Sequence, residues 1–251
     1  MAPRVSDLVK SSVRALIPAS LFTPAAYLNQ WISGDQEPEL RQLKRWIRPG
    51  SRAIDVGANN GIYAYMMLRA RALVEAFEPN PLCVARLKAY AGHHRRLTVH
   101  SVALSDSTQG ATLFVPIVNG RPNSGLASLT PRPGALPIPG IQTTKLDQFG
   151  FSDVSFIKVD VEGHELEVVR GAEATLKHNR PVLQVEIESR HGGSVSEMAD
   201  YLKRLCGYDG WFFRAAKLVP AARLTPEEQR WGNVPYINNF LFLPANETHS
   251  N

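Results

Sequence analysis

Short apolar runs alternate with segments of helical periodicity through most of the 251 residues of this chain. Seven of these runs are expected to be strands, at residues 52–57, 73–77, 97–103, 154–159, 182–187, 206–213 and 238–243. Helices are expected between them, at residues 38–47, 62–70, 81–91, 165–176 and 195–205. Strands and helices that alternate at this spacing predict an α/β fold whose mostly parallel sheet is covered on both faces. The last two strands, joined by a short connection, predict an antiparallel edge.

A proline- and glycine-rich stretch interrupts this alternation in the middle of the chain. Residues 116–140 contain six prolines and four glycines, which excludes a long helix. Extended segments are expected on either side of it, at 111–115 and 141–146. We therefore predict a β-hairpin-like insertion over about 111–146, which serves either as a lid over the sheet or as an irregular connection.

The chain divides into three predicted parts, an N-terminal helical segment at 1–50, the α/β domain at 51–244 and a tail at 245–251. Apolar residues from Val5 to Ile17 recur at helical spacing, and Pro18 ends this amphipathic helix. Asp7 and Arg14 within it are not typical of a signal peptide. We expect this helix to pack either on the domain or on a second subunit of a homo-oligomer, with a peripheral membrane contact as the alternative. Its narrow apolar stripe favours packing.

The charge and the cysteine content exclude several classes of protein. Lys and Arg number 28 against 23 Asp and Glu, a net charge of +5, and the basic residues are scattered. This pattern is typical of a solvated basic surface and does not by itself indicate nucleic-acid binding. The two cysteines, Cys83 and Cys206, cannot alone form a disulfide framework or a four-ligand zinc site, and they favour a reducing, cytoplasmic setting. The sequence has no run of about 18 apolar residues that would predict a membrane-spanning helix.

A glycine-containing turn between the first strand of the domain and the following helix is the first candidate site. Gly57 lets the backbone turn sharply and lets a ligand approach, and residues 58–61 place free N–H groups at the helix N-terminus. Glu78 follows Gly57 by about twenty residues, at the end of the next strand, with Pro79 and Asn80 after it. An acidic residue at that place can accept hydrogen bonds from both hydroxyls of a ribose.

Two cofactors fit this arrangement, a nicotinamide dinucleotide and S-adenosylmethionine. A dinucleotide site requires G-x-G-x-x-G, but this turn is G-A-N-N-G and lacks the second glycine, which admits the pyrophosphate. Asp55, just before the turn, would repel a pyrophosphate but could receive the ammonium group of a methionine moiety. We therefore favour S-adenosylmethionine over the dinucleotide, and we favour both over a turn that binds no ligand.

The second candidate site follows the strand at 154–159, where the chain reads Lys158-Val-Asp160-Val-Glu162-Gly163-His164-Glu165. Three carboxylates and an imidazole are thus gathered at a strand end that points into the ligand crevice. We expect Asp160 and Glu162 to act in catalysis, and His164 is either a base or a bystander. Glu167 is assigned to stabilisation of the helix N-terminus.

Glu186, at the end of the next strand, shares its parity with Lys158 and Asp160, so these side chains are expected on one side of the sheet. Lys158 and Glu186 can then form a buried pair that orders the site. Alternatively, Asp160, Glu162 and Glu186 hold a hard divalent cation. We favour a reaction without a metal, because an Asp-x-Glu spacing on one strand end is not a strong metal signature.

Six segments of the chain resemble the FkbM family of methyltransferases, residues 52–61, 76–81, 102–106, 144–147, 156–171 and 239–244. The most specific runs from Lys158 to Gly171 and matches the family pattern K-x-D-x-E-G-x-E-x-x-x-L-x-G, except that Val169 replaces the usual Leu. Glu37-Pro-Glu39 is similar to the acidic segment that precedes the first strand in the family. The resemblance covers about 35–244 and leaves out the N-terminal helix.

The resemblance implies a Rossmann-like class I methyltransferase sheet of seven strands that uses S-adenosylmethionine to methylate a hydroxyl. It implies that Asp55 and the turn border the methionine part, Glu78 the ribose, and Ala103 with Leu104 the adenine. The full set of expected cofactor residues is Asp55, Gly57, Ala58, Asn59, Gly61, Glu78, Pro79, Asn80, Ala103, Leu104 and Asp160. The expected catalytic residues are Asp160, Glu162, His164 and Lys158, although the position of His164 varies in the family.

The resemblance also implies the class of acceptor. Members of the family act on sugars and on hydroxyls of polyketides or other natural products. We expect a sugar hydroxyl of a glycolipid, polysaccharide or lipo-oligosaccharide, with a polyketide or another secondary metabolite as the alternative. The residues expected near this small-molecule or glycan acceptor are Ser128, Glu186, Glu188 and His191, together with Asn123 and Ser124 in the insertion.

Two other classes of function are disfavoured. An inactive binding module with this fold would be expected to lose its strand-end carboxylates, but Asp160, Glu162 and Glu186 are present. Methylation of nucleic-acid bases requires an N/D-P-P-Y/F loop or a nucleophilic cysteine. This chain has Asp-Val-Glu-Gly after the strand at 154–159, and both cysteines are expected on helices away from the crevice.

Overall fold

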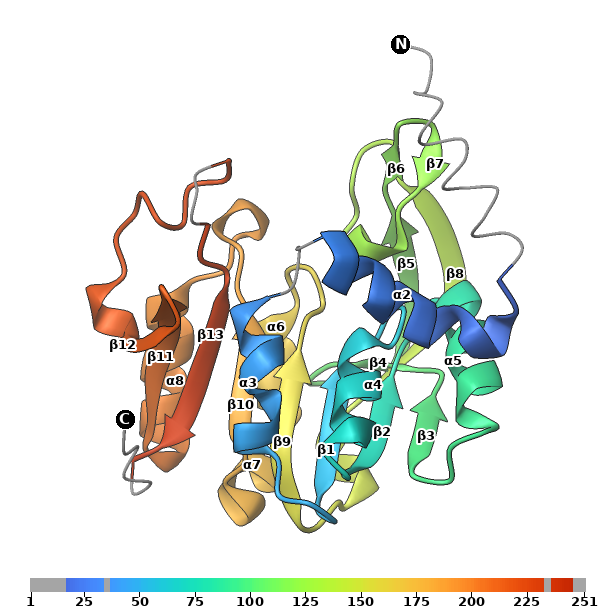
Figure 1. The fold of residues 1–251 in the computed structure, drawn as a ribbon. Helices are drawn as coiled ribbons and strands as arrows, with labels where there is room; N and C mark the ends of the chain where they lie inside the picture. Colours follow the sequence, from blue (N-terminus) through green and yellow to red (C-terminus); the bar gives the residue numbers. More distant parts are fainter. Residues whose placement is uncertain (1–16, 34–36, 233–235, 246–251) are drawn as a thin grey trace.

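The computed structural model describes residues 17–33, 37–232 and 236–245 (Figure 1). The amphipathic helix expected from Val5 onward lies outside the described residues up to position 16, and so does the tail from 246. Within the described ranges, no helix combines the length and the apolar character needed to cross a membrane.

The central sheet has eight strands in the order β12-β11-β13-β10-β9-β1-β2-β3 (Figure 1). Their bounds are β1 Arg52–Val56, β2 Leu73–Phe77, β3 Leu97–His100, β9 Val154–Val159, β10 Val182–Glu186, β11 Tyr208–Arg214, β12 Lys217–Pro220 and β13 Asn239–Pro244. Neighbours from β10 to β3 pair in parallel, whereas β13 pairs antiparallel with β10 and β11, and β12 with β11. The predicted mostly parallel sheet with an antiparallel edge is confirmed, and β12 is added to the seven expected strands.

Helices cover both faces of this sheet (Figure 1). Their bounds are α2 Ala19–Ser33, α3 Pro38–Trp46, α4 Ile62–Arg69, α5 Pro81–Ala91, α6 Glu165–Arg170, α7 Glu173–Asn179 and α8 Val195–Cys206. Ala53 of β1 and Phe156 of β9 belong to the core under α3, α4 and α5, and Ile54 and Val56 to the core under α6, α7 and α8. Side chains alternate between the two faces of a strand, which explains why neighbours in β1 enter different cores.

The predicted insertion forms a second sheet that stands over the carboxyl ends of the central strands (Figure 1). It consists of β4 Ala103–Leu104, β8 Leu136–Thr144 and β5 Gly110–Val115, in that order, with β5 antiparallel to β8. A small hairpin of β6 Ile117–Val118 and β7 Arg121–Pro122 follows β5. The hairpin-like insertion is therefore confirmed.

The structure corrects the start of the second strand of this hairpin. β8 begins at Leu136 rather than at 141 and runs through Pro137 and Pro139. β4 pairs only with Thr143 and Thr144, so in the described structure one side of β8 has no strand partner at the prolines. Proline lacks an N–H donor and is tolerated in a strand where that side needs no partner.

The structure also divides two elements that the sequence predicts as continuous. The strand expected at 97–103 ends at His100, and Ala103 begins β4 in the other sheet. The helix expected at 165–176 is interrupted at Gly171, where a Cβ atom would lie 2.0 Å from the carbonyl oxygen of Ser105. Asp147 then accepts the N–H groups of the first turn of α7, which gives this second helix its own start.

Two further differences lie at the ends of the chain. The last two predicted strands are not joined by a short connection, because β12 and residues 221–238 lie between them.

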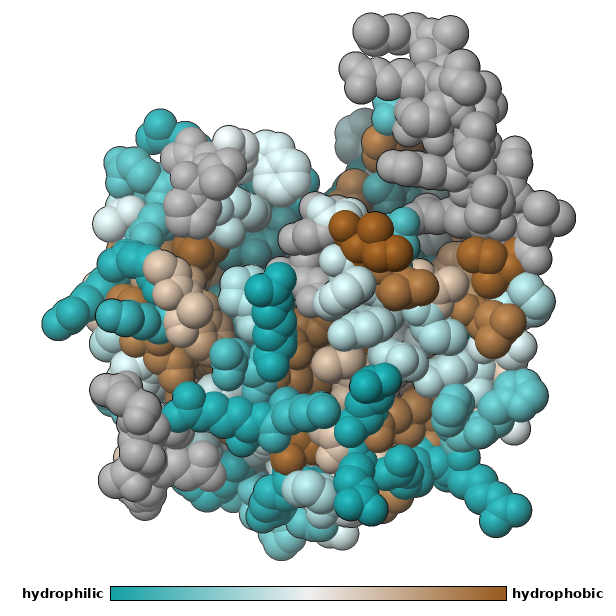
Figure 2. Space-filling model, in the orientation of Figure 1, coloured by the Kyte–Doolittle hydropathy of each residue, from teal (hydrophilic) through white to brown (hydrophobic). Residues whose placement is uncertain are grey.

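The helix α2 is not predicted, since Pro24 inside it is a breaking signal. α2 packs against α4 and α5. Figure 2 shows brown, hydrophobic surface over α2. The large apolar side chains that this helix exposes are Leu21, Leu28, Trp31 and Ile32.

Candidate active site

The turn after β1 brings the ends of β1 and β9 into direct contact. Gly57 has φ +78°, and a Cβ atom there would lie 1.8 Å from the carbonyl oxygen of Asp160. A side chain at this place is therefore excluded both by the backbone conformation and by the neighbouring strand. Gly61 has the same φ, and its Cβ atom would lie 2.6 Å from Leu87, so that α4 packs closely on α5.

Glu78 lies beside this turn, directly after β2, and is 5% exposed. Its Oε2 atom accepts the N–H of Asn59 at 2.7 Å, and its Oε1 atom accepts the N–H of Asn80 at 2.8 Å. Burial raises the pKa of Glu78 to about 7. Each carboxylate oxygen has a second lone pair, so the side chain can also accept hydrogen bonds from a ligand.

A first cavity, with about 590 Å³ of empty space, lies between these strand ends and the insertion. The expected cofactor residues that line it are Gly57, Asn59, Glu78, Pro79, Ala103, Leu104 and Asp160. Apolar side chains that the sequence analysis did not identify complete the wall, among them Val56, Phe77, Val102, Leu113, Leu129 and Val161. A carboxylate beside an apolar wall suits a ligand with a hydroxylated part and a flat apolar part.

A second cavity shares Gly57, Asn59 and Asp160 with the first. The other residues that line it are Gln30, Glu37, Asp55, Ala58, Asn60, Ile62, Tyr63 and Lys158. Asn60 Oδ1 is buried and has no hydrogen-bond partner among the residues that the structure describes. Together with the carboxylates of Glu37 and Asp160, it forms an acceptor surface that suits a cationic group.

Asp55 stabilises the backbone beside this second cavity. Its Oδ2 atom accepts the N–H of Ala64 at 2.9 Å, so the carboxylate holds the first turn of α4. The residue is 2% exposed, and burial raises its pKa to about 7. The expected contact between Asp55 and an ammonium group stays a prediction, whereas its contact with α4 is direct.

Lys158 is a buried cation between two carboxylates. Its Nζ atom lies 3.4 Å from Asp160 Oδ2 and 3.7 Å from Glu186 Oε2, and the side chain is 1% exposed. Burial alone would lower the pKa of Lys158, but the charges of Asp160 and Glu186 raise it well above its usual value. Lys158 therefore stays protonated and orders Asp160 and Glu186, as the predicted buried pair requires.

Residues that the sequence did not single out complete the surroundings of Lys158. Its Nζ atom donates to Asn239 Oδ1 at 3.4 Å and lies 5.0 Å from the centre of the Tyr63 ring. Gln184 Nε2 donates to Tyr63 and to the same oxygen of Asn239. Tyr63 in turn donates to Glu37, which the sequence analysis noted only as part of an acidic segment. Gln184 precedes Glu186 by two residues in β10, so both side chains lie on the same face of the sheet.

The loop after β9 is fixed by the insertion. Glu162 has φ +58° and Gly163 has φ +97°. The carbonyl oxygen of Glu162 accepts a hydrogen bond from Ser128 Oγ at 2.7 Å and another from Arg132 Nη2 at 3.1 Å. Side chains of the insertion thus bind it to the loop after β9.

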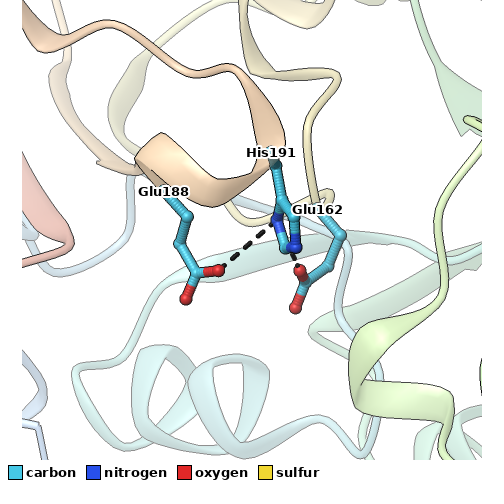
Figure 3. Close-up of side chains that lie close together, drawn as sticks. All are labelled: Glu162, Glu188 and His191. Carbon is cyan, nitrogen blue, oxygen red and sulfur yellow. Dashed lines mark ion pairs between the residues drawn. The ribbon is translucent and has the colours of Figure 1, made fainter. Parts of the chain in front are cut away.

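Glu162, Glu188 and His191 converge at the ends of β9 and β10 (Figure 3). His191 Nδ1 lies 3.1 Å from Glu162 Oε2 and 3.4 Å from Glu188 Oε2. Burial, and then the charge of Asp160, raise the pKa of Glu162 to about 8. Burial also lowers the pKa of His191. The expected cation set of Asp160, Glu162 and Glu186 is not gathered in this way, because Asp160 and Glu186 contact Lys158.

His164 lines the first cavity, and its Nε2 atom lies 2.9 Å from Ser105 Oγ. Its Nδ1 atom lies 3.6 Å from Glu167 Oε2. Burial lowers the pKa of His164, which favours the neutral imidazole. Both ring nitrogens of His164 thus face a partner, and its role as a base stays a prediction.

Two side chains named from the sequence are buried in the structure. Ser128, expected at the acceptor, lines the first cavity but is 1% exposed, because its hydroxyl donates to Glu162 and accepts from the N–H of Thr130. Cys83, expected away from the crevice, lies under the turn and donates to Asn59 Oδ1 at 3.5 Å. Burial raises the pKa of the Cys83 thiol to about 12, so this cysteine is not a nucleophile.

Comparisons with known proteins identify a matching family, a related sequence and a related structure. Residues 55–209, more than half of the chain, match the family model of the methyltransferase FkbM domain. Over 155 residues the chain is 28% identical to the 2-O-methyltransferase NoeI of Sinorhizobium fredii (strain NBRC 101917 / NGR234), an alignment that covers 53% of this chain and 62% of that protein. The crystal structure of methyltransferase FkbM from Methylobacillus flagellatus KT matches with a TM-score of 0.50 at 17% identity, over 94% of this chain and 60% of that chain. The chain thus spans less than two thirds of either protein, and the structural match shows a shared fold.

Proposed function

Because this chain belongs to the FkbM family of methyltransferases, we propose that it is an O-methyltransferase that takes its methyl group from S-adenosylmethionine. The observation that carries this proposal is the buried carboxylate of Glu78, which lines the first cavity beside the Gly57 turn. In an open α/β sheet, an acidic residue at this place accepts the hydroxyl hydrogens of a ribose. The name of the relative NoeI specifies transfer to an oxygen, which supports O-methylation.

The two cavities suit the two halves of this cofactor. In the first, Glu78 would hold the ribose, and Phe77 with Leu104 would contact the adenine. In the second, Asn60 Oδ1 is a buried acceptor that needs a donor, and the ammonium group of the methionine part supplies one. When bound, S-adenosylmethionine supplies an electrophilic methyl group. Asp160, which lines both cavities, marks the place where the two halves meet.

We assign the residues after β9 to deprotonation and alignment of the acceptor hydroxyl. An alkyl hydroxyl is a very weak acid, so its proton must be removed as the new bond forms, and a positioned base is typically worth about 10²–10⁴-fold in rate. Lys158 fixes Asp160, which lines both cavities, and His164 lines the first of them as well. Holding the acceptor oxygen in line would contribute several kcal/mol more.

A sugar is the acceptor class that the surroundings of the site suit best. Trp231 is 62% exposed, and the Arg190 guanidinium lies 3.9 Å from the centre of its ring. Arg190 also pairs with Glu188, so this aromatic surface is continuous with the strand-end carboxylates. An exposed aromatic face packs against the C–H face of a sugar ring, while Arg190 can donate to its hydroxyls.

Binding of S-adenosylhomocysteine tests the cofactor assignment. Glu78→Gln keeps the shape of the side chain but removes the negative charge and one acceptor atom. Charge-assisted hydrogen bonds are worth about 1.5–3 kcal/mol, so the variant should bind S-adenosylhomocysteine roughly 10- to 100-fold more weakly in a calorimetric titration.

Glu75→Gln is the matched control, because Glu75 is a buried carboxylate of β2, the strand that precedes Glu78, and contacts Arg52 and His100 instead. It should bind S-adenosylhomocysteine like the unaltered protein. No binding to the unaltered protein, or tighter binding of NADH, would refute the assignment.

A further inference from the structure

Three side chains from two strand ends point toward one another above the sheet (Figure 3). Glu162 belongs to the loop after β9, and Glu188 and His191 belong to the segment after β10. From their convergence we infer that Glu162, Glu188 and His191 bind one divalent transition-metal ion. The cation set expected from the sequence combines Glu162 with Asp160 and Glu186 instead, and the sequence predicts that Glu188 and His191 contact the acceptor.

Both distances from the His191 nitrogen to a carboxylate oxygen are those expected of a metal site. His191 Nδ1 lies 3.1 Å from Glu162 Oε2 and 3.4 Å from Glu188 Oε2, and one ligand atom from each residue lies within 4.8 Å of the others. Ligand atoms at about 2.0–2.2 Å from one ion, at tetrahedral or octahedral angles, lie about 3.0–3.5 Å apart. The two measured distances fall in this range.

The hydrogen bonding of these atoms supplies a second, independent observation. Glu162 Oε2 and His191 Nδ1 are buried, and neither has a hydrogen-bond partner in the part of the chain that the structure describes. The two atoms are close enough to bond to each other but lack the geometry of a hydrogen bond. The Glu162 side chain is only 10% exposed, so water compensates little for the missing partner. A cation between the two atoms would satisfy both.

Local structure holds the three residues in this arrangement. A Cβ atom at Gly163 would lie 3.1 Å from the Cβ of His191, so the glycine allows the two loops to approach. Glu188 and His191 are three residues apart in one turn, in which the His191 N–H donates to the Glu188 carbonyl at 3.0 Å. Arg190 contacts Glu188, and Arg132 lies 3.9 Å from Glu162. Their charges offset part of the repulsion between the two carboxylates before an ion binds.

The donor set selects the kind of ion. One imidazole nitrogen and two carboxylate oxygens suit Mn²⁺, Fe²⁺ or Zn²⁺, whereas Mg²⁺ and Ca²⁺ prefer oxygen ligands alone. Glu162 is two residues from Asp160, so the ion would lie close to the acceptor oxygen and polarise it as a Lewis acid. This role in the reaction rests on the proposed function, but binding of the ion does not.

Titration of the full chain with MnCl₂, after treatment with EDTA and without any nucleoside, tests the inference. Calorimetry and the loss of the free Mn²⁺ signal in electron paramagnetic resonance should both give one Mn²⁺ per chain. Glu188→Gln and His191→Gln should each weaken binding at least tenfold. His178→Gln, at an exposed histidine in the last turn of α7, should leave it unchanged.

Pulsed electron paramagnetic resonance of Mn²⁺ on the unaltered chain needs no variant and should show coupling to one imidazole nitrogen. Failure to bind Mn²⁺ or Zn²⁺ at one per chain, absence of the nitrogen coupling, or full affinity in both variants would overturn the site. Separate titration with S-adenosylhomocysteine distinguishes the two proposals. If Mn²⁺ binds and S-adenosylhomocysteine does not, the metal site stands and the proposed function fails. If S-adenosylhomocysteine binds and Mn²⁺ does not, the proposed function stands and the metal site fails.

Discussion

Buried carboxylates at the strand ends are held by backbone N–H groups. Asp55 accepts from Ala64, and Glu78 accepts from Asn59 and Asn80. These bonds fix the first turn of α4 and the two turns beside the first cavity. Burial nevertheless raises the pKa of both carboxyl groups to about 7, because the surroundings exclude water. The same side chains therefore order the backbone and keep the site sensitive to pH.

Replacement of Asp55 should change how stability depends on pH. Its pKa is about 7 in the folded state against 3.8 without the fold, so between these values the folded state binds more protons than the unfolded state. Stability therefore falls as pH rises through this window, by at most about 1.4 kcal/mol per pH unit from this group. Asp55→Asn keeps an acceptor for Ala64 and removes the titration.

Urea unfolding of both proteins at about pH 5 and about pH 7.5 measures this contribution. The free energy of unfolding of Asp55→Asn minus that of the unaltered protein should be larger at the higher pH, because only the unaltered protein loses stability from this group. Identical pH dependence in the two proteins would show that Asp55 does not titrate with the fold.

Gly57 and Gly50 require glycine for different physical reasons. Both have positive φ, but a Cβ atom at Gly57 meets the backbone of Asp160, whereas nothing lies within 4 Å of one at Gly50. Gly50→Ala should cost about 1–2 kcal/mol of unfolding free energy from backbone conformation alone. Gly57→Ala should cost at least about 3 kcal/mol, because a strand end must also move. Equal losses in urea unfolding would contradict the close contact between β1 and β9.

At the level of elements, the differences from the sequence-based prediction arise where one segment contacts another far along the chain. Periodicity predicts a continuous helix over 165–176, but the contact of Gly171 with Ser105 divides it. Short stretches such as β4 and β12 depend on their pairing partners rather than on a pattern of their own. The insertion was predictable from its prolines and glycines, whereas its attachment to Glu162 was not.

The attachment of the insertion can be tested through Ser128. Ser128→Ala removes the hydrogen bond to the Glu162 carbonyl and the acceptor of the Thr130 N–H. A single buried hydrogen bond is worth about 1 kcal/mol and an orphaned group costs about 1–3 kcal/mol, so exchange of the Thr130 amide with deuterium should accelerate about tenfold or more. Thr108→Ala, at an exposed residue bonded to Gln148, should leave it unchanged. Unaltered exchange in Ser128→Ala would show that other contacts hold the insertion.

For the whole molecule, the sequence predicts the sheet, its antiparallel edge and the residues of the glycine turn, because each leaves a local pattern. Glu78 could be identified because ligand sites of α/β sheets recur at strand ends. The convergence of Glu162 with His191 could not, because it depends on how two loops approach in three dimensions. The apolar wall of the first cavity was missed for the same reason, since residues such as Leu113 come from the insertion.

Transfer of a deuterated methyl group from S-adenosylmethionine tests the central claim most directly. The purified chain is incubated with the labelled cofactor and with glycan and small-molecule fractions of the producing cells, and the products are analysed by mass spectrometry. We predict the label in a methyl ether on a sugar oxygen, at a rate that Glu78→Gln lowers at least about tenfold under limiting cofactor. Label on the hydroxyl of a polyketide would contradict the sugar assignment, and no labelled product in any fraction, despite binding of S-adenosylhomocysteine, would contradict the assignment as an enzyme.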